Sequence, residues 1–269
     1  MKVLVSDNLS SSGVDNLKKE SGLEVDVNTG LSKEELIKII PAYDGLIVRS
    51  ATKVVAEIIE AADNLKVIGR AGIGVDNIDL DAAGKKGIIV MNAPEGNIIT
   101  TAEHTMALLM SMSRNIPQAR SALKNKKWAP KEFMGVELFE KTLGIIGLGR
   151  IGSIVAERAR AFHMKIVAYD PYISQERAEK LGVELVELKD LLGRSDFLTL
   201  HTPGLAGKPL LGKEEFGQMK PGMRLVNCAR GSLIDDDALI DAIKSKQVAG
   251  AALDVYHKEP LNLDSPLLQ

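Results

Sequence analysis

Short apolar runs alternate with amphipathic segments along the N-terminal part of the chain. The apolar runs predict strands at residues 2–7, 23–27, 44–50, 65–71 and 87–92. The segments between them place apolar residues at helical spacing, at residues 13–20, 33–40, 54–63 and 80–86. Because strands that alternate with helices need crossover connections, this part of the chain predicts a parallel sheet.

The pattern changes after residue 97. Residues 97–124 form one long stretch at helical spacing, with few charges in its first half, which predicts a helix buried between domains or subunits. A second series of strands is predicted at residues 141–149, 164–170, 195–203, 222–230 and 248–256. Amphipathic helices separate these strands, as at 235–246. We therefore predict two α/β domains with a boundary near 93–100, where the loop 92–97 contains proline and glycine and is a plausible hinge.

Composition narrows the class of protein without indicating its chemistry. The chain has 269 residues, 45% hydrophobic and 26% charged, which is typical of a globular protein with one large or two ordinary domains. No apolar run approaches the roughly 18 residues that a membrane helix needs, and the first residues turn polar too soon for a signal peptide. A single cysteine, Cys228, excludes an internal disulfide, and a net charge of -2 gives no reason to expect nucleic acid. We expect a cytoplasmic protein without a membrane partner.

The sharpest motif is Gly147-x-Gly149-x-x-Gly152. A predicted strand precedes it, a helix is predicted from Ile151 onward, and a second strand ends at Asp170, 18 residues after Gly152. In this context the first glycine permits a tight turn, the second lets the backbone approach a pyrophosphate, and the third allows close helix–strand packing. The phosphates would lie at the helix N-terminus, and the acid would accept hydrogen bonds from a ribose diol and repel a 2′-phosphate. The motif predicts NAD rather than NADP; a glycine turn without a ligand is the alternative.

A second glycine-rich segment, residues 69–76, lacks such a helix and acid. Backbone that lines a small-molecule cleft and a simple turn remain equal alternatives for it.

Residues 227–260, from NCARG to HKEP, closely resemble the signature of the D-isomer-specific 2-hydroxyacid dehydrogenases. Residues 49–54, 69–79, 92–97 and 131–152 resemble the same family in collinear order, and most of all its phosphoglycerate dehydrogenase branch. The resemblance therefore spans almost the whole chain.

The resemblance implies two doubly wound parallel-sheet domains and a homodimer. A flavodoxin-like substrate-binding domain would occupy residues 1–96, and a Rossmann NAD-binding domain residues 97–269. It implies catalytic roles for Arg230 and Glu259. The cofactor-binding residues that it implies are Gly147, Gly149, Arg150, Ile151, Gly152, Asp170, Thr202, Cys228, Ala229 and Asp254. The residues that it implies near a small anionic 2-hydroxy acid are Arg49, Arg70, Ile73, Gly74 and Asn97.

The chemistry of the residues agrees with those roles. A 2-hydroxy acid needs a fixed cation for its carboxylate, and arginine offers a planar bidentate fork. Arg230 follows an apolar strand, and ligands of open α/β sheets bind at the carboxyl ends of strands. A surface arginine in a turn is the alternative. Glu259 alone would be a solvated loop acid, and only its pairing with Arg230 in the signature favours catalysis. No metal site is predicted.

The four histidines do not match the catalytic histidine that the resemblance implies beyond Glu259. We expect His104 to be packed and hydrogen-bonded, His163 to cap a helix, His201 to end a strand near the cofactor, and His257 to be exposed. The chain ends ten residues after Glu259. We therefore expect a fragment of a longer enzyme, with impaired acid–base catalysis and uncovered apolar surface on the first domain; a variant kept for binding is the alternative.

Two departures from the resemblance affect the expected substrate and one loop. Pro130 stands where the phosphoglycerate dehydrogenase branch has a basic residue, and Lys131 could compensate for it. The stretch 201–212 lacks the polar run that usually follows HTP, which predicts an altered surface loop. The function implied is NAD-dependent oxidation of D-3-phosphoglycerate, which opens serine synthesis. The alternatives are a hydroxypyruvate/glyoxylate reductase of the same family and a non-catalytic NAD-sensing module.

Overall fold

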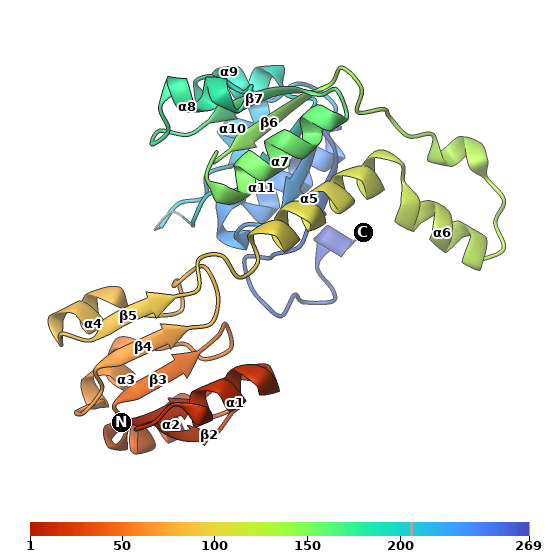
Figure 1. Ribbon diagram of the computed structural model, residues 1–269. Coiled ribbons are helices and arrows are strands. Elements are labelled where there is room, and N and C mark those ends of the chain that lie inside the picture. Colours follow the sequence, from red (N-terminus) through yellow and green to blue (C-terminus); the bar gives the residue numbers. More distant parts are fainter. Residues whose placement is uncertain (205–206, 269) are drawn as a thin grey trace. The chain divides into compact units, whose positions relative to one another are not determined.

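The computed structural model describes residues 1–204 and 207–268 and divides the chain into two compact units. Unit 1 is Met1–Asn97 and unit 2 is Ile98–Gln269 (Figure 1). Leu205 and Ala206, in the loop that we expect to be altered, and Gln269 lie outside the described residues.

Unit 1 is a five-stranded parallel sheet with the order β2-β1-β3-β4-β5. This order is that of the flavodoxin-like doubly wound fold, as expected. Its strands are β1 Lys2–Val5, β2 Glu24–Val27, β3 Gly45–Val48, β4 Val67–Arg70 and β5 Ile89–Asn92. Its helices are α1 Ser11–Lys19, α2 Lys33–Ile39, α3 Ala56–Ala61 and α4 Leu80–Lys85, with the short 3-10 helix η1 at Ile40–Ala42.

Polar side chains fix where the helices of unit 1 begin. The hydroxyl of Ser10 accepts a hydrogen bond from the backbone of α1, and the carboxylate of Asp79 accepts one from the backbone of α4. Ser32 and Glu35 form a reciprocal capping box at the start of α2. The apolar faces of α2 and α3 then pack on the sheet, where Leu36 and Ile58 are each 1% exposed.

Unit 2 is a six-stranded parallel sheet with the order β11-β10-β9-β6-β7-β8. Numbered from β6, this is the strand order of the Rossmann fold. Its strands are β6 Thr142–Ile146, β7 Lys165–Tyr169, β8 Glu184–Leu185, β9 Phe197–Leu200, β10 Met223–Asn227 and β11 Val248–Leu253. The sequence pattern missed β8, because a two-residue edge strand is too short to show an alternation.

Helices cover both faces of the sheet of unit 2. One hydrophobic cluster joins the sheet to α5, α7 and α8, and a second joins it to α9, α10 and α11. The helices are α5 Ile98–Ser113, α6 Ile116–Lys124, α7 Arg150–Ala161, α8 Gln175–Lys180, α9 Leu188–Arg194, α10 Lys213–Gln218 and α11 Asp236–Lys244. Unit 2 also contains three short 3-10 helices, η2 Pro130–Phe133, η3 Gly231–Leu233 and η4 Pro266–Leu268, among the described residues. None of the helices among the described residues is long and apolar enough to cross a membrane.

The expectation of one helix over residues 97–124 is wrong. Two helices replace it, because Asn115 adopts a left-handed conformation with φ 51° and Pro117 stands in the first turn of α6. Proline has no N–H for the hydrogen bond that would continue α5. Burial also differs, since α5 has a buried face while α6 has no buried residue. In Figure 1, α6 projects away from the sheet of unit 2.

Candidate functional site

The expected cofactor residues of unit 2 lie at the carboxyl ends of its parallel strands. The glycine motif follows β6, Asp170 follows β7, Thr202 follows β9, and Cys228 follows β10, with Asp254 after β11. The strand order reverses between β6 and β9, and at such a switch point an open α/β sheet forms its ligand crevice.

The three glycines of the motif differ in what surrounds them. Gly147 has φ 93°, and a Cβ there would lie 2.7 Å from the backbone carbonyl of His201, at the end of the neighbouring strand. A Cβ on Gly152 would overlap the carbonyl oxygen of Gly147. Packing therefore requires both of these glycines. In contrast, a Cβ on Gly149 would meet no atom within 4 Å, so open space lies in front of the loop there.

The N-terminus of α7 fits an anion. Gly149 is its N-cap and offers no side-chain hydrogen bond, and the first turn contains no acidic residue. The first N–H groups of a helix have no acceptor within the helix, and the helix dipole adds partial positive charge there. The residues present therefore fit the pyrophosphate of a dinucleotide.

Asp170 supports the glycine loop directly. Its Oδ2 accepts a hydrogen bond of 2.8 Å from the backbone N–H of Leu148. Its Oδ1 accepts a hydrogen bond of 2.9 Å from the backbone N–H of Tyr172. Each carboxylate oxygen can accept a further bond, so the group can hold the loop and still accept from a ligand hydroxyl.

Asn227 holds the turn that carries Arg230. This fully buried side chain donates from Nδ2 to the carbonyl of Arg230 at 2.9 Å and accepts at Oδ1 from the N–H of Ala229 at 3.0 Å. The Arg230 Nη1 in turn donates to the carbonyl of Ala229 at 2.7 Å. Sequence reasoning did not single out Asn227, although a polar residue that ends an apolar strand is a usable signal.

The turn after Arg230 lies against the segment that leads to Glu259. A Cβ on Gly231 would overlap the backbone of Tyr256, so only glycine permits this close approach. The exposed Glu259 folds back within that segment, where its Oε1 accepts from the N–H of Tyr256 at 3.0 Å.

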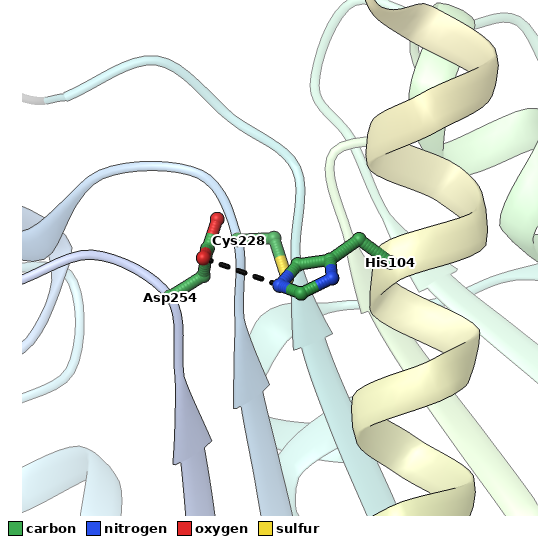
Figure 2. Close-up of side chains that lie close together, drawn as sticks. All are labelled: His104, Cys228 and Asp254. Atoms are coloured by element: carbon green, nitrogen blue, oxygen red, sulfur yellow. Dashed lines mark hydrogen bonds and ion pairs between the residues drawn. The ribbon is translucent and has the colours of Figure 1, made fainter.

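His104 is more exposed than the sequence predicts. Its side chain is 45% exposed, so it is not packed, but it is hydrogen-bonded: Nε2 lies 3.2 Å from Oδ1 of Asp254. Cys228 lies beside this pair, which brings together α5 and the ends of β10 and β11 (Figure 2). Burial raises the pKa of the Cys228 thiol to about 11, so the thiol is protonated at neutral pH.

His163 and His257 lie as expected, and His201 follows a strand, as predicted. His163 follows the end of α7 with φ 57° and donates its N–H to the carbonyl of Arg160, while His257 is exposed. His201 follows β9, and its Nε2 lies 3.0 Å from the hydroxyl of Thr199. Burial lowers the pKa of His201 to about 4, so its imidazole is neutral at pH 7.

In unit 1, Asp7 shapes the loop that carries Arg49. Its buried carboxylate accepts from the backbone N–H of Arg49 at 2.6 Å, from that of Thr52 at 3.1 Å, and from the Thr52 hydroxyl at 2.7 Å. From the other side, Asn77 Nδ2 donates to the carbonyls of Arg49 and Thr52, each at 2.7 Å. Sequence reasoning missed Asp7 and Asn77 as supports of this loop. An acid two residues after a buried strand was the available signal.

The glycine-rich segment of unit 1 packs on Arg70, the last residue of β4. A Cβ on Gly72 would overlap the Arg70 guanidinium, and Asn92 donates from Nδ2 to the carbonyl of Ile73 at 2.6 Å. Gly74 follows in the same loop, and Asn97 ends the unit. Because the order of the sheet reverses between β1 and β3, the loop of Arg49 lies at the switch point of unit 1.

Comparison with known proteins identifies the family. Residues 106–269 match the model of the "D-isomer specific 2-hydroxyacid dehydrogenase, NAD binding domain". A D-3-phosphoglycerate dehydrogenase of Archaeoglobus fulgidus is 54% identical over 270 aligned residues, which cover 100% of this chain and 51% of that protein. The chain thus spans about half the length of the curated relatives that it matches.

Two solved structures are similar to this chain, and each match covers most of this chain and most of the other protein. A glyoxylate reductase from Paecilomyes thermophila has 30% identity and a TM-score of 0.91, covering 100% of this chain and 85% of that one. A D-lactate dehydrogenase from Aquifex aeolicus, in complex with NAD and lactic acid, has 31% identity and a TM-score of 0.83. That match covers 96% of this chain and 78% of the other.

Proposed function

The chain belongs to the D-isomer-specific 2-hydroxyacid dehydrogenase family, and from this premise we propose that it serves the NAD-dependent oxidation of D-3-phosphoglycerate to 3-phosphohydroxypyruvate, the first step of serine biosynthesis. The family's NAD-binding domain lies in unit 2. The observation that carries the proposed substrate is the 54% identity to a D-3-phosphoglycerate dehydrogenase over the whole of this chain.

In this proposal the cofactor lies along the strand ends of unit 2. The N-terminus of α7, with Gly149, Arg150 and Ile151, holds the pyrophosphate, and Asp170 accepts from the ribose hydroxyls while it holds Leu148. Thr202, Cys228, Ala229 and Asp254 line the nicotinamide end of the site. NAD, when bound, supplies the acceptor for the hydride that leaves C2 of the hydroxy acid.

Arginines provide the charge that an anionic substrate needs. The Arg230 fork pairs with the carboxylate, and the Asn227 hydrogen bonds hold its turn in place. In unit 1, which contains the substrate-binding domain that we propose at residues 1–96, Arg49 and Arg70 bind anionic groups. The backbone at Ile73 and Gly74 and the side chain of Asn97 are the other substrate-binding groups that we propose in unit 1.

Glu259 would act through a histidine, by orienting the ring and stabilising its protonated form. In this structure His201 is neutral, His104 is paired with Asp254, and His163 follows a helix end. We therefore propose that the chain binds NAD and substrate but turns them over slowly. A positioned acid–base group contributes roughly 10²–10⁴-fold.

Calorimetry and turnover assays test the proposal. We expect the chain to bind NAD and D-3-phosphoglycerate, and Arg230→Ala and Arg49→Ala each to weaken binding of the hydroxy acid by at least about tenfold. The exposed Arg177→Ala is the matched control for Arg230, and the exposed Lys18→Ala controls unit 1. Unchanged binding of D-3-phosphoglycerate in both arginine variants would contradict the assignment.

A hydroxypyruvate/glyoxylate reductase is the second candidate. The TM-score of 0.91 to a glyoxylate reductase favours it, as does Pro130 at a position where the resemblance expects a basic residue. Turnover of glyoxylate with NADH, and none of D-3-phosphoglycerate with NAD, would select this function. NAD binding with no turnover of either substrate, at high enzyme concentration, would select the non-catalytic NAD-sensing module.

We also propose a cytoplasmic homodimer. The single cysteine fits a reducing compartment. The arm formed by α6 and the residues up to Phe139 exposes large apolar side chains, with Trp128 at 82% and Met134 at 80%. Such an exposed apolar surface is typical of an interface. Sedimentation should show a dimer that Trp128→Ser weakens, whereas a monomer at all concentrations would refute it.

A further inference from the structure

Three side chains with metal-binding atoms converge at the ends of β10 and β11. Nε2 of His104, Sγ of Cys228 and a carboxylate oxygen of Asp254 all lie within 4.8 Å of one another. The nitrogen and the oxygen are already 3.2 Å apart. Figure 2 shows the sulfur of Cys228 beside the imidazole of His104, which is hydrogen-bonded to Asp254. Within residues 1–204 and 207–268 no second group of three such ligands occurs.

We propose that this cluster binds a zinc ion. Imidazole nitrogen, thiolate sulfur and carboxylate oxygen are the ligands of Zn²⁺, and three protein ligands plus water make up its open tetrahedral site. Metal–ligand lengths of about 2.0–2.3 Å put the ligand atoms of a tetrahedron roughly 3.3–3.6 Å apart. The His104–Asp254 separation therefore needs almost no change, and small side-chain rotations bring in the sulfur.

The surroundings of the cluster permit this coordination. The side chains of His104 and Asp254 are 45% and 49% exposed, so they can adjust, and water can reach the fourth position. The buried Cys228 gives the site a soft ligand, which selects zinc over Mg²⁺ or Ca²⁺ because these ions prefer oxygen ligands. On binding, the sulfur–metal bond replaces the S–H bond and the proton leaves to solvent.

A cobalt titration tests the metal site without NAD. The chain has one cysteine, so any sulfur-to-cobalt charge-transfer absorption reports on Cys228 alone. We expect the full chain to take up one equivalent of Co²⁺ with this absorption, and Zn²⁺ to displace it. Absence of the absorption at saturating Co²⁺ would overturn the proposal.

Variants identify the other two ligands. His104→Gln and Asp254→Asn should each weaken Zn²⁺ binding by more than about 100-fold, since even an outer-shell partner is worth about 10- to 100-fold. Both side chains are half exposed, so the variants should fold, which circular dichroism checks. The exposed His257→Gln is the control and should bind Zn²⁺ like the wild type. Unchanged Zn²⁺ affinity in both ligand variants would overturn the site.

Zinc should also exclude NAD. This consequence rests on the proposed function, because that function places Cys228 and Asp254 beside the nicotinamide. The affinity of the cluster for zinc does not depend on the proposed function. NAD titrated into the zinc-loaded chain should bind at least about tenfold more weakly than to the metal-free chain. Equal NAD affinity of the zinc-loaded and metal-free chains would show that zinc and NAD bind at different places, without contradicting the metal site. Failure of the metal-free chain to bind NAD would overturn the proposed function alone.

Discussion

The carboxylate of Asp170 accepts a hydrogen bond of 2.8 Å from the backbone N–H of Leu148, inside the glycine loop. This residue, which the sequence predicts to accept hydrogen bonds from a ribose, holds the loop that precedes α7. Asparagine keeps one acceptor oxygen, which can still accept from Leu148, while it loses the charge and the second acceptor.

Substitutions of Asp170 should therefore have graded effects on cofactor binding. We expect Asp170→Ala to weaken NAD binding by about 10- to 100-fold, because hydrogen bonds to a charged group are worth about 1.5–3 kcal/mol each. Asp170→Asn should lose less, and both variants should bind NADP better relative to NAD, since the charge that repels a 2′-phosphate is gone. Calorimetric titration with the two cofactors measures this, with the exposed Glu179→Ala as control. Wild-type NAD affinity in Asp170→Ala would remove the residue from the site.

Two glycines of the motif should behave in opposite ways. Gly149→Ala places its methyl group in open space, so the free energy of unfolding should change by less than about 1 kcal/mol. Its NAD affinity should nevertheless fall, because the methyl group occupies the space of the pyrophosphate. Gly152→Ala should lose about 1–3 kcal/mol of stability, because its Cβ overlaps the carbonyl oxygen of Gly147. Urea unfolding and calorimetry test the pair; Gly149→Ala with wild-type NAD affinity would contradict the assignment.

Asp7 should control the order of the loop that carries Arg49. Asp7→Ala leaves three hydrogen-bond donors of residues 49–52 without their acceptor, at a cost of about 1–3 kcal/mol for each that stays buried. We expect faster hydrogen exchange of the amides of Arg49 and Thr52, together with weaker binding of D-3-phosphoglycerate. The exposed Asp15→Ala should exchange like the wild type. Unaltered protection of the loop in Asp7→Ala would show that Asn77 alone suffices.

His201 should make the protein less stable in mild acid. Burial lowers its pKa from 6.5 to about 4, so between these values the unfolded state binds a proton that the folded state does not. Stability is then full above pH 6.5 and decreases as the pH falls toward 4, by up to about 3 kcal/mol. Urea unfolding across this range should show the slope, and His201→Gln should remove this part of it. The slope should persist in the exposed His257→Gln.

Much of the fold was predictable because it is encoded locally. Alternating apolar and amphipathic segments predicted every strand except β8 and most helices of both units, and a glycine motif between a strand and a helix located the turn before α7. The break between α5 and α6 also had a local signal, since Pro117 lies within the stretch that the pattern assigned to one helix. The apolar periodicity of residues 97–124 nevertheless favoured a single helix.

The partners of the polar side chains could not be predicted in the same way. Asp7 meets Arg49 and Thr52 across two neighbouring strands, and His104 meets Asp254 across 150 residues of sequence. A sequence pattern determines which residues share one strand or helix face, but not which loop ends meet. The sequence by itself therefore determined the two parallel sheets, the family and the place of the glycine loop. Only the tertiary structure decided the supports of Arg49 and Arg230 and the meeting of His104, Cys228 and Asp254, because strand order and packing set those distances.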